Sequence, residues 1–237
     1  MAQTDSSMSP PIESSPGKTR ADDQIIGLAD ALKRSTADHH LRAEKTGIIA
    51  KILTQKATLP EYARYLRNLL PIYQALEKPI ADNRSLESLS PLLDKSLRRV
   101  GSLVLDLDEI VGRDDWRKMP IVPATDQYVA HINNIRDTSP HALAGHIYVR
   151  YLGDLNGGRV LRTLLTKQFS LDESALNFYR FAEIENLKTY RTEYRSNINV
   201  LAATPAERSE IIAVAIQGFQ YNIDLSTTIA CQGADEK

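Results

Sequence analysis

One stretch near the middle of the chain combines several glycines with a carboxylate. Residues 145–161 have a helical pattern, yet they contain Gly153, Gly157 and Gly158, and Asp154 directly follows the first of these glycines. A glycine inside a helix costs roughly 1 kcal/mol relative to alanine, so three cost on the order of 3 kcal/mol. Such a cost is usually offset where another group approaches the backbone closely, or where the helix bends.

Two interpretations of these glycines are open at this point. Gly153 and Gly157 lie one turn apart, a spacing typical of close packing between two helices. A flat hydrophobic ligand lying across the helix would also need a face without side chains, and Asp154 would then place a polar group beside it. Phosphate binding is not indicated, because the GxGxxG and P-loop spacings are both absent.

The histidine spacing gives little support for a metal site made by protein ligands alone. No pair has the HxxxH or HExxH spacing that places two ligands on one helix face. Glu61 and Glu77 do not belong to ExxH motifs, so a di-iron carboxylate bundle is not expected. An axial ligand to a porphyrin iron needs only one histidine. The five candidates are His39, His40, His131, His141 and His146.

A basic and aromatic cluster occupies one later helix. Arg191 and Arg195 lie one turn apart, as do Tyr190 and Tyr194. The cluster is either a solvated edge beside a core stripe or a site for carboxylates, which suit the planar fork of arginine. The spacing does not choose between these interpretations.

Composition indicates a globular protein inside the cell. The chain has 237 residues, a formal net charge of −1, and 42% hydrophobic residues. This charge gives no support for binding to nucleic acid. The single cysteine excludes an internal disulfide framework. No apolar run reaches the ~18 residues that a membrane span needs, so we expect no membrane anchor and a cytoplasmic location, with the plastid stroma as the weaker alternative.

Helices, predicted from the hydrophobic periodicity and the capping signals, must position these residues. A disordered arm is expected over residues 1–22, a single all-α domain over 23–230, and a flexible tail over 231–237. Capping boxes are predicted at residues 58–61, 170–173 and 204–207. No segment shows sustained strand alternation. The expected helices cover residues 23–47, 62–83, 90–107, 125–136, 140–167, a short segment around 178, 183–201 and 205–229.

Several segments together resemble the heme (haem) oxygenase family. Residues 151–158 are similar to its distal-helix signature, with Asn156 where the family usually has serine. Residues 32–44 resemble its first-helix motif, in which the proximal histidine falls on His40 and Glu44 follows one turn later. The remaining matches, in the same order along the chain, are residues 72–77, 194–196 and 219–223. The resemblance covers about residues 24–230.

The resemblance implies a heme b held between a proximal first helix and a glycine-kinked distal helix. His40 would be the axial ligand to the iron, and Glu44 would hold its other ring nitrogen. The catalytic residues would be Asp154, Tyr73, Arg150, Gly153 and Gly157. The heme would be contacted by His40, Glu44, Lys33, Tyr148, Gly158, Arg191, Arg195 and Phe219, of which Lys33, Tyr148, Arg191 and Arg195 fall where the family engages the propionates.

The implied reaction is oxidative cleavage of heme with O2 to biliverdin, carbon monoxide and ferrous iron. Electrons would come from an external donor, a ferredoxin or a flavoprotein reductase, because the sequence has no flavin or nicotinamide fingerprint of its own. One alternative is a heme-binding carrier or sensor that keeps the fold without catalysis. Another is an all-α protein whose matching segments are packing motifs.

Overall fold

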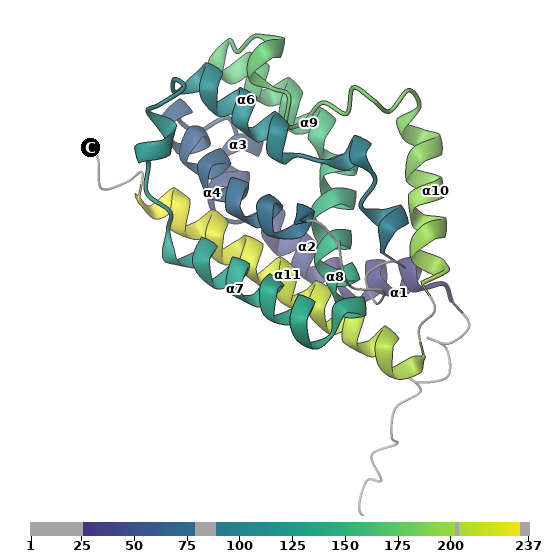
Figure 1. Cartoon of the computed structure of the whole chain (residues 1–237). Coiled ribbons are helices and arrows are strands. Elements are labelled where there is room, and N and C mark those ends of the chain that lie inside the picture. Colours follow the sequence, from purple (N-terminus) through teal and green to yellow (C-terminus); the bar gives the residue numbers. More distant parts are fainter. Residues whose placement is uncertain (1–25, 79–88, 202–203, 233–237) are drawn as a thin grey trace, which may run out of the picture.

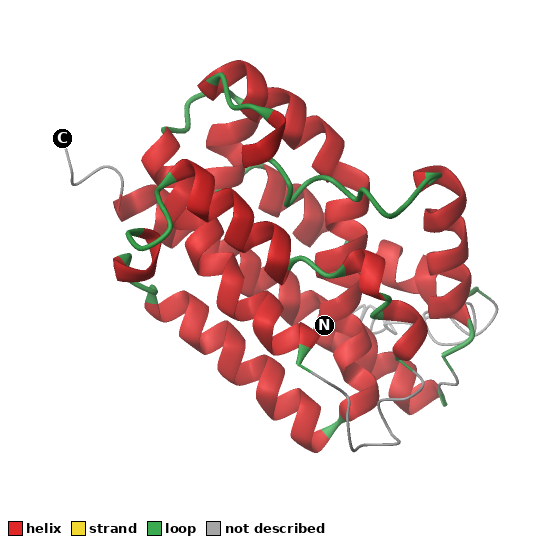
Figure 2. Cartoon of the chain, turned by 45° about the horizontal axis from the view of Figure 1, so that its top comes forward, coloured by secondary structure: helices red, strands yellow, loops and turns green. Residues whose placement is uncertain are grey.

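The described part of the chain is built from helices. A computed structural model describes residues 26–78, 89–201 and 204–232. Every regular element within these ranges is helical, as Figure 2 shows. The all-α prediction is therefore confirmed. The arm predicted over residues 1–22 lies outside the described residues.

The α-helices follow one another with short connections. They are α1 (Leu28–Ser35), α2 (Ala37–Glu44), α3 (Gly47–Leu53), α4 (Leu59–Glu77), α6 (Val100–Ile110), α7 (Pro123–Thr138), α8 (Leu143–Ile147), α9 (Gly153–Phe169), α10 (Leu187–Asn199) and α11 (Pro205–Gln232). A π-helical turn, Tyr148–Leu152, joins α8 to α9. Short 3₁₀ turns cover Ser90–Leu92, Lys95–Leu97, Trp116–Lys118, Pro140–Ala142 and Glu173–Ala175.

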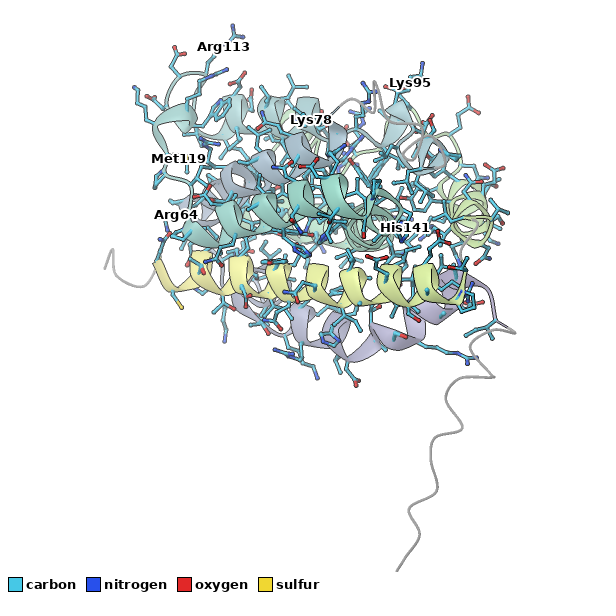
Figure 3. All side chains as sticks on the ribbon, turned by 60° about the horizontal axis from the view of Figure 1, so that its bottom comes forward. Arg64, Lys78, Lys95, Arg113, Met119 and His141 are labelled. Carbon is cyan, nitrogen blue, oxygen red and sulfur yellow. The ribbon has the colours of Figure 1, made fainter. Side chains whose placement is uncertain are left out.

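Two long helices organise the core. The last helix, α11, packs against α1, α2, α3, α7 and α8, while α4 packs against α6 and α7. In Figure 1, α11 (yellow) and α7 lie side by side along the lower face, and α10 stands at the right-hand end next to α1. In Figure 3, His141 lies close to the ribbon of α11, where its Nε2 is 2.8 Å from Glu210 Oε2. None of the helices in the described ranges is long and apolar enough to cross a membrane.

Two of the predicted capping boxes form. At the start of α4, Glu61 N–H donates to Thr58 Oγ1 at 3.3 Å and Thr58 N–H donates to Glu61 Oε2 at 2.8 Å. Thr204 and Glu207 make the same reciprocal pair before α11. These hydrogen bonds satisfy N–H groups that the first helical turn leaves without partners.

The third predicted capping box is wrong. Ser170 adopts a left-handed conformation (φ 54°) that ends α9, and a 3₁₀ turn follows it in place of an α-helix. Phe178 and Tyr179, expected on a short helix, lie in a turn.

Other element boundaries also differ from the prediction. The first helix is divided at Thr36, whose Oγ1 donates to Leu32 O at 2.8 Å. The helix predicted from residue 90 begins only at Val100, since Glu77 accepts hydrogen bonds from the N–H groups of Arg99 and Val100 and so caps α6 there. The last helix continues to Gln232, two residues into the expected tail.

Buried charges tie the loop after α9 to α6. Asp106 accepts hydrogen bonds from the backbone N–H groups of Asn177 and Phe178 at 2.7 and 2.8 Å. The guanidinium of Arg99 donates to the carbonyl oxygens of Phe178 and Arg180 at 3.2 and 3.0 Å. Hydrogen bonds to charged groups are stronger than neutral ones. The loop that carries Phe178 and Tyr179 is therefore held rigidly against the helical core.

Candidate active site

A pocket opens between the proximal helix α2 and the junction of the π turn with α9. The space between its walls is about 680 Å³ when the part open to bulk solvent is included. Its walls come from α2, α4, α11, the π turn, the start of α9 and the loop after α9. The pocket brings together residues that the sequence analysis selected from three separate segments: His40, Glu44, Arg150, Gly153, Asp154 and Phe219.

His40 is the histidine that faces this pocket. Its side chain is 54% exposed, and its Nδ1 lies 3.7 Å from Glu44 Oε1 one turn later on α2. This distance is slightly longer than a direct hydrogen bond, so the two groups are in near contact. The edge-on ring of Phe219 lies 5.8 Å from the His40 ring, measured between centroids. His39 does not line the pocket, so the geometry favours His40 as a ligand to an iron bound there.

Asp154 is held on the opposite wall by two partners. The hydroxyl of Tyr73 donates a hydrogen bond to Asp154 Oδ2. Arg150 donates to the same hydroxyl from Nε at 3.1 Å and from Nη2 at 2.9 Å, and Nη2 lies 3.8 Å from Asp154 Oδ1. Arg150 Nη1 also donates to Asn222 Oδ1 on α11. The carboxylate is thus fixed by a network that joins α4, the π turn and α11.

Burial sets the charge states of this network. Burial raises the pKa of Asp154, although Arg150 and the Tyr73 hydrogen bond act to lower it. The pKa of Tyr73 is raised well above its ordinary value, mainly by burial. Burial lowers the pKa of Arg150, but the nearby Tyr73 and Asp154 more than reverse this effect. Asp154 is therefore a stronger base than an exposed aspartate, next to a permanent cation and a neutral phenol.

The glycines play different parts in the structure. A Cβ built on Gly153 or Gly157 would meet no atom within 4 Å, and of the two Gly153 lines the pocket. Gly158 is buried, and its Cβ would lie 3.3 Å from Tyr179 Cδ1. At Gly145 the Cβ would lie 2.6 Å from the carbonyl oxygen of Ile211 on α11. Close packing against α11 therefore explains why residue 145 is a glycine. At Gly153 and Gly157 no protein atom fills the space, which leaves room for a bound ligand.

The comparisons with known proteins agree with this arrangement. The family model described as "Heme oxygenase" matches residues 26–228. The chain belongs to the heme oxygenase family. A heme oxygenase of Takifugu rubripes is 34% identical over 201 residues, which cover 84% of this chain and 72% of that protein. A heme oxygenase of Porphyra purpurea is 31% identical over 85% of this chain and 86% of its own length.

Solved structures of heme oxygenases have the same fold. The structure of the Leptospira interrogans protein superposes with a TM-score of 0.81 at 29% identity, covering 86% of this chain and all 100% of that one. Heme oxygenase-1 of Synechocystis, solved in complex with heme, gives a TM-score of 0.81 at 28% identity over 89% of this chain and 96% of its own. These likenesses do not favour the interpretation of the matching segments as packing motifs.

The residues present fit the heme that the family implies. A heme needs an accessible nitrogen ligand, a flat space without side chains and apolar walls. His40 provides the first, the face of Gly153 provides the second, and Phe178 and Phe219 belong to the third. The residues of this heme oxygenase family member are thus of the kinds that would hold the macrocycle.

The four residues matched to the propionates do not line the pocket itself. Lys33 is exposed on α1 and Tyr148 is buried on the π turn. On α10, Arg195 Nη2 lies 2.6 Å from Asp30 Oδ1, and Arg191 Nη1 donates to Asn156 Oδ1 at 3.4 Å. Burial raises the pKa of Tyr148, which a hydrogen bond with Thr36 and the charge of Arg195 act to lower. The two arginines therefore lie near α1 and α9, and each has a protein partner of its own.

Sequence reasoning missed several residues of the site. The π turn had no recognisable signal, although such turns are frequent at functional sites. Asn222 lies in a segment that matched the family and was not selected. Tyr65 lines the pocket, yet in the sequence it forms part of an apolar stripe that indicates only core.

Proposed function

We propose that this chain cleaves heme with O2 and electrons from an external donor, giving biliverdin, carbon monoxide and ferrous iron. Membership of the heme oxygenase family supports this activity. The observation that carries it most directly is the placement of Asp154, held by Tyr73 and Arg150, in the same pocket as His40. A simple heme carrier would not need a buried carboxylate with a raised pKa on the face opposite the axial ligand.

On the proximal side, His40 would hold the heme iron, and Glu44, whose Oε1 lies 3.7 Å from His40 Nδ1, would orient the imidazole. Such a partner fixes the ring orientation and increases the basicity of a ligating histidine. Phe219 would contact the face of the heme beside His40, as its edge-on packing against that ring supports. The bound heme would supply the chemistry of dioxygen activation.

On the distal side, the protein would control space and protons. Gly153 and Gly157 leave room for the macrocycle and a small ligand above it. Arg150 and Tyr73 orient the Asp154 carboxylate, which can hold ordered water and take up or deliver a proton at Oδ1, the oxygen to which Tyr73 does not donate. Gly158 would act indirectly, by allowing Tyr179 to pack against the distal helix.

At the heme edge, Lys33, Tyr148, Arg191 and Arg195 would engage the propionates. Arginine suits this task, because its planar fork binds carboxylates with two parallel hydrogen bonds. We also propose that a ferredoxin or a flavoprotein reductase supplies electrons and that the protein works in the cytoplasm, in keeping with its single cysteine.

The Asp154→Ala variant tests the proposed function. We expect the variant to bind hemin and to show the spectrum of the wild-type complex, but to form no biliverdin in a single turnover with ascorbate as reductant. Asp126→Ala, which removes an exposed carboxylate on α7, is the matched control and should keep full turnover. Unchanged turnover in Asp154→Ala would refute the role assigned to this carboxylate.

A further inference from the structure

The corner between α2 and α3 is held by a serine that has no part in the function proposed above. Ser226 on α11 is only 2% exposed, and it lines the same pocket as His40. Its hydroxyl donates to Thr46 O at 3.1 Å and accepts from the N–H of Ile49 at 3.3 Å. A side chain from the far end of the sequence thus binds the backbone on both sides of the first residue of α3.

The hydroxyl of Ser226 supplies the N-cap that α3 lacks. Helix α3 begins at Gly47, so Ile49 is its third residue, whose N–H an N-cap side chain normally binds. Thr46 holds the N-cap position but makes no such hydrogen bond. The Thr46 hydroxyl donates instead to Arg42 O in the last turn of α2. The cap of α3 therefore comes from α11, and it uses the serine hydroxyl as donor and as acceptor.

Gly47 allows this corner to lie directly on the backbone of α11. Its φ is +61°, in the left-handed region that favours glycine. A Cβ built on Gly47 would lie 2.3 Å from both the carbonyl carbon and the carbonyl oxygen of Ser226. The backbone contact and the serine hydroxyl therefore fix the corner at the same point of α11.

The helix that ends at this corner has little packing of its own. No residue of α2 is buried, although the helix lies against α11 (Figure 1). His40 is seven residues before Gly47, and Phe219, which packs against the His40 ring, is seven residues before Ser226. The two contacts between α2 and α11 are thus about two turns apart on each helix. Because α2 has no buried side chain to fix it, a movement of the corner would also move His40.

We propose that Ser226 is a positioning residue for His40. By capping α3 from α11, its hydroxyl fixes the corner after the proximal helix and so the position of the imidazole in the pocket. This role rests on the proposed function, because it concerns the axial ligand to the iron. The cap itself is a property of the protein without heme.

Amide hydrogen exchange in the heme-free protein tests the cap. In Ser226→Ala, we expect the N–H of Ile49 to exchange about 5- to 150-fold faster, the range for a buried donor left unpaired. The N–H of Leu66, which is buried in α4, reports on global unfolding and should change less. The matched control is Ser209→Ala, which removes an exposed hydroxyl from the same helix. Unchanged exchange at Ile49, or equal acceleration at Ile49 and Leu66, would overturn the cap.

Resonance Raman spectra of the reduced hemin complex test the positioning role. We expect the iron–histidine stretching band of Ser226→Ala to be shifted or broadened. Hemin should also dissociate about two- to tenfold faster, the range for the net loss of one hydrogen bond. Ser209→Ala should match the wild type in both measurements. An unchanged iron–histidine band in Ser226→Ala would overturn the positioning role, because a purely structural serine would leave that band as it is.

A second variant covers a failure of Ser226→Ala to fold. Ser226→Cys then replaces it in both measurements with the same expected direction, since a thiol is close in size to the hydroxyl but is a weak acceptor. If the wild-type hemin complex shows no histidine ligation, the proposed function fails at His40. The exchange of the Ile49 N–H still decides in that case whether Ser226 caps α3.

Discussion

Replacing Gly153 by alanine separates the stability of the helix from the binding of a ligand. The backbone at Gly153 is helical (φ −59°, ψ −49°), and an added Cβ would meet no protein atom within 4 Å. Alanine is better than glycine by about 1 kcal/mol inside a helix. The free energy of unfolding of the heme-free protein should therefore rise by about 1 kcal/mol, which raises Tm by roughly 2–4 °C for a domain of this size.

In the proposed complex, the same methyl group would occupy space that the heme needs. Forcing an extra methyl into a filled site costs about 1–3 kcal/mol, which corresponds to roughly a 5- to 150-fold increase in the Kd for hemin. Thermal unfolding of the heme-free protein and a hemin titration followed in the Soret band measure the two effects. Gly153→Ala should stabilise the free protein and weaken its complex.

A matched substitution serves as the control. At Gly145 the new Cβ would lie 2.6 Å from a backbone oxygen of α11, so Gly145→Ala should lower the stability of the free protein. Destabilisation by Gly153→Ala, or a hemin affinity equal to that of the wild type, would refute the claim that this glycine is kept for a ligand.

Two other predictions concern histidines. His40→Ala should abolish the histidine-ligated absorption spectrum of the hemin complex and His39→Ala should retain it; the opposite result would reassign the ligand. Burial and the nearby His131 lower the pKa of His146 to about 3, against about 6.5 in an unfolded chain. Between these values only the unfolded chain takes up the proton, so the stability of the wild type should fall as pH falls below about 6.5, by about 1.4 kcal/mol per pH unit from this residue. His146→Leu should lose this contribution in urea unfolding measured from pH 7 to pH 5, and an identical pH dependence in both proteins would contradict the assignment.

Local signals in the sequence were sufficient for much of the fold. Threonine and glutamate three residues apart predicted the starts of α4 and α11, because a capping box depends only on residues within one helical turn. The same pattern failed at residues 170–173, where the chain takes a left-handed conformation at Ser170.

Long-range contacts account for what the sequence did not predict. The late start of α6 depends on Glu77, which reaches it from the end of α4. The loop after α9 depends on Asp106 and Arg99, about seventy to eighty residues away along the chain. Such partners have no local pattern, so a single sequence does not reveal them.

Part of the candidate site could likewise be predicted from the sequence, and part could not. His40 and Glu44 lie one turn apart on α2, so helical spacing placed them on one face. Arg150, four residues before Asp154, was selected only through the family resemblance. Tyr65 was missed because a tyrosine on an apolar stripe has the same periodicity whether its hydroxyl points into core or into a pocket. Only the packing of α4 against the distal helix distinguishes these cases.

The most direct test of the central claim is a single turnover of the purified wild-type protein with one equivalent of hemin, ascorbate and O2. We expect a shifted Soret band on addition of hemin, then loss of that band and appearance of the biliverdin absorption. A stable Soret band without biliverdin would contradict the proposed activity and favour a heme carrier, and no Soret shift would contradict the heme site itself.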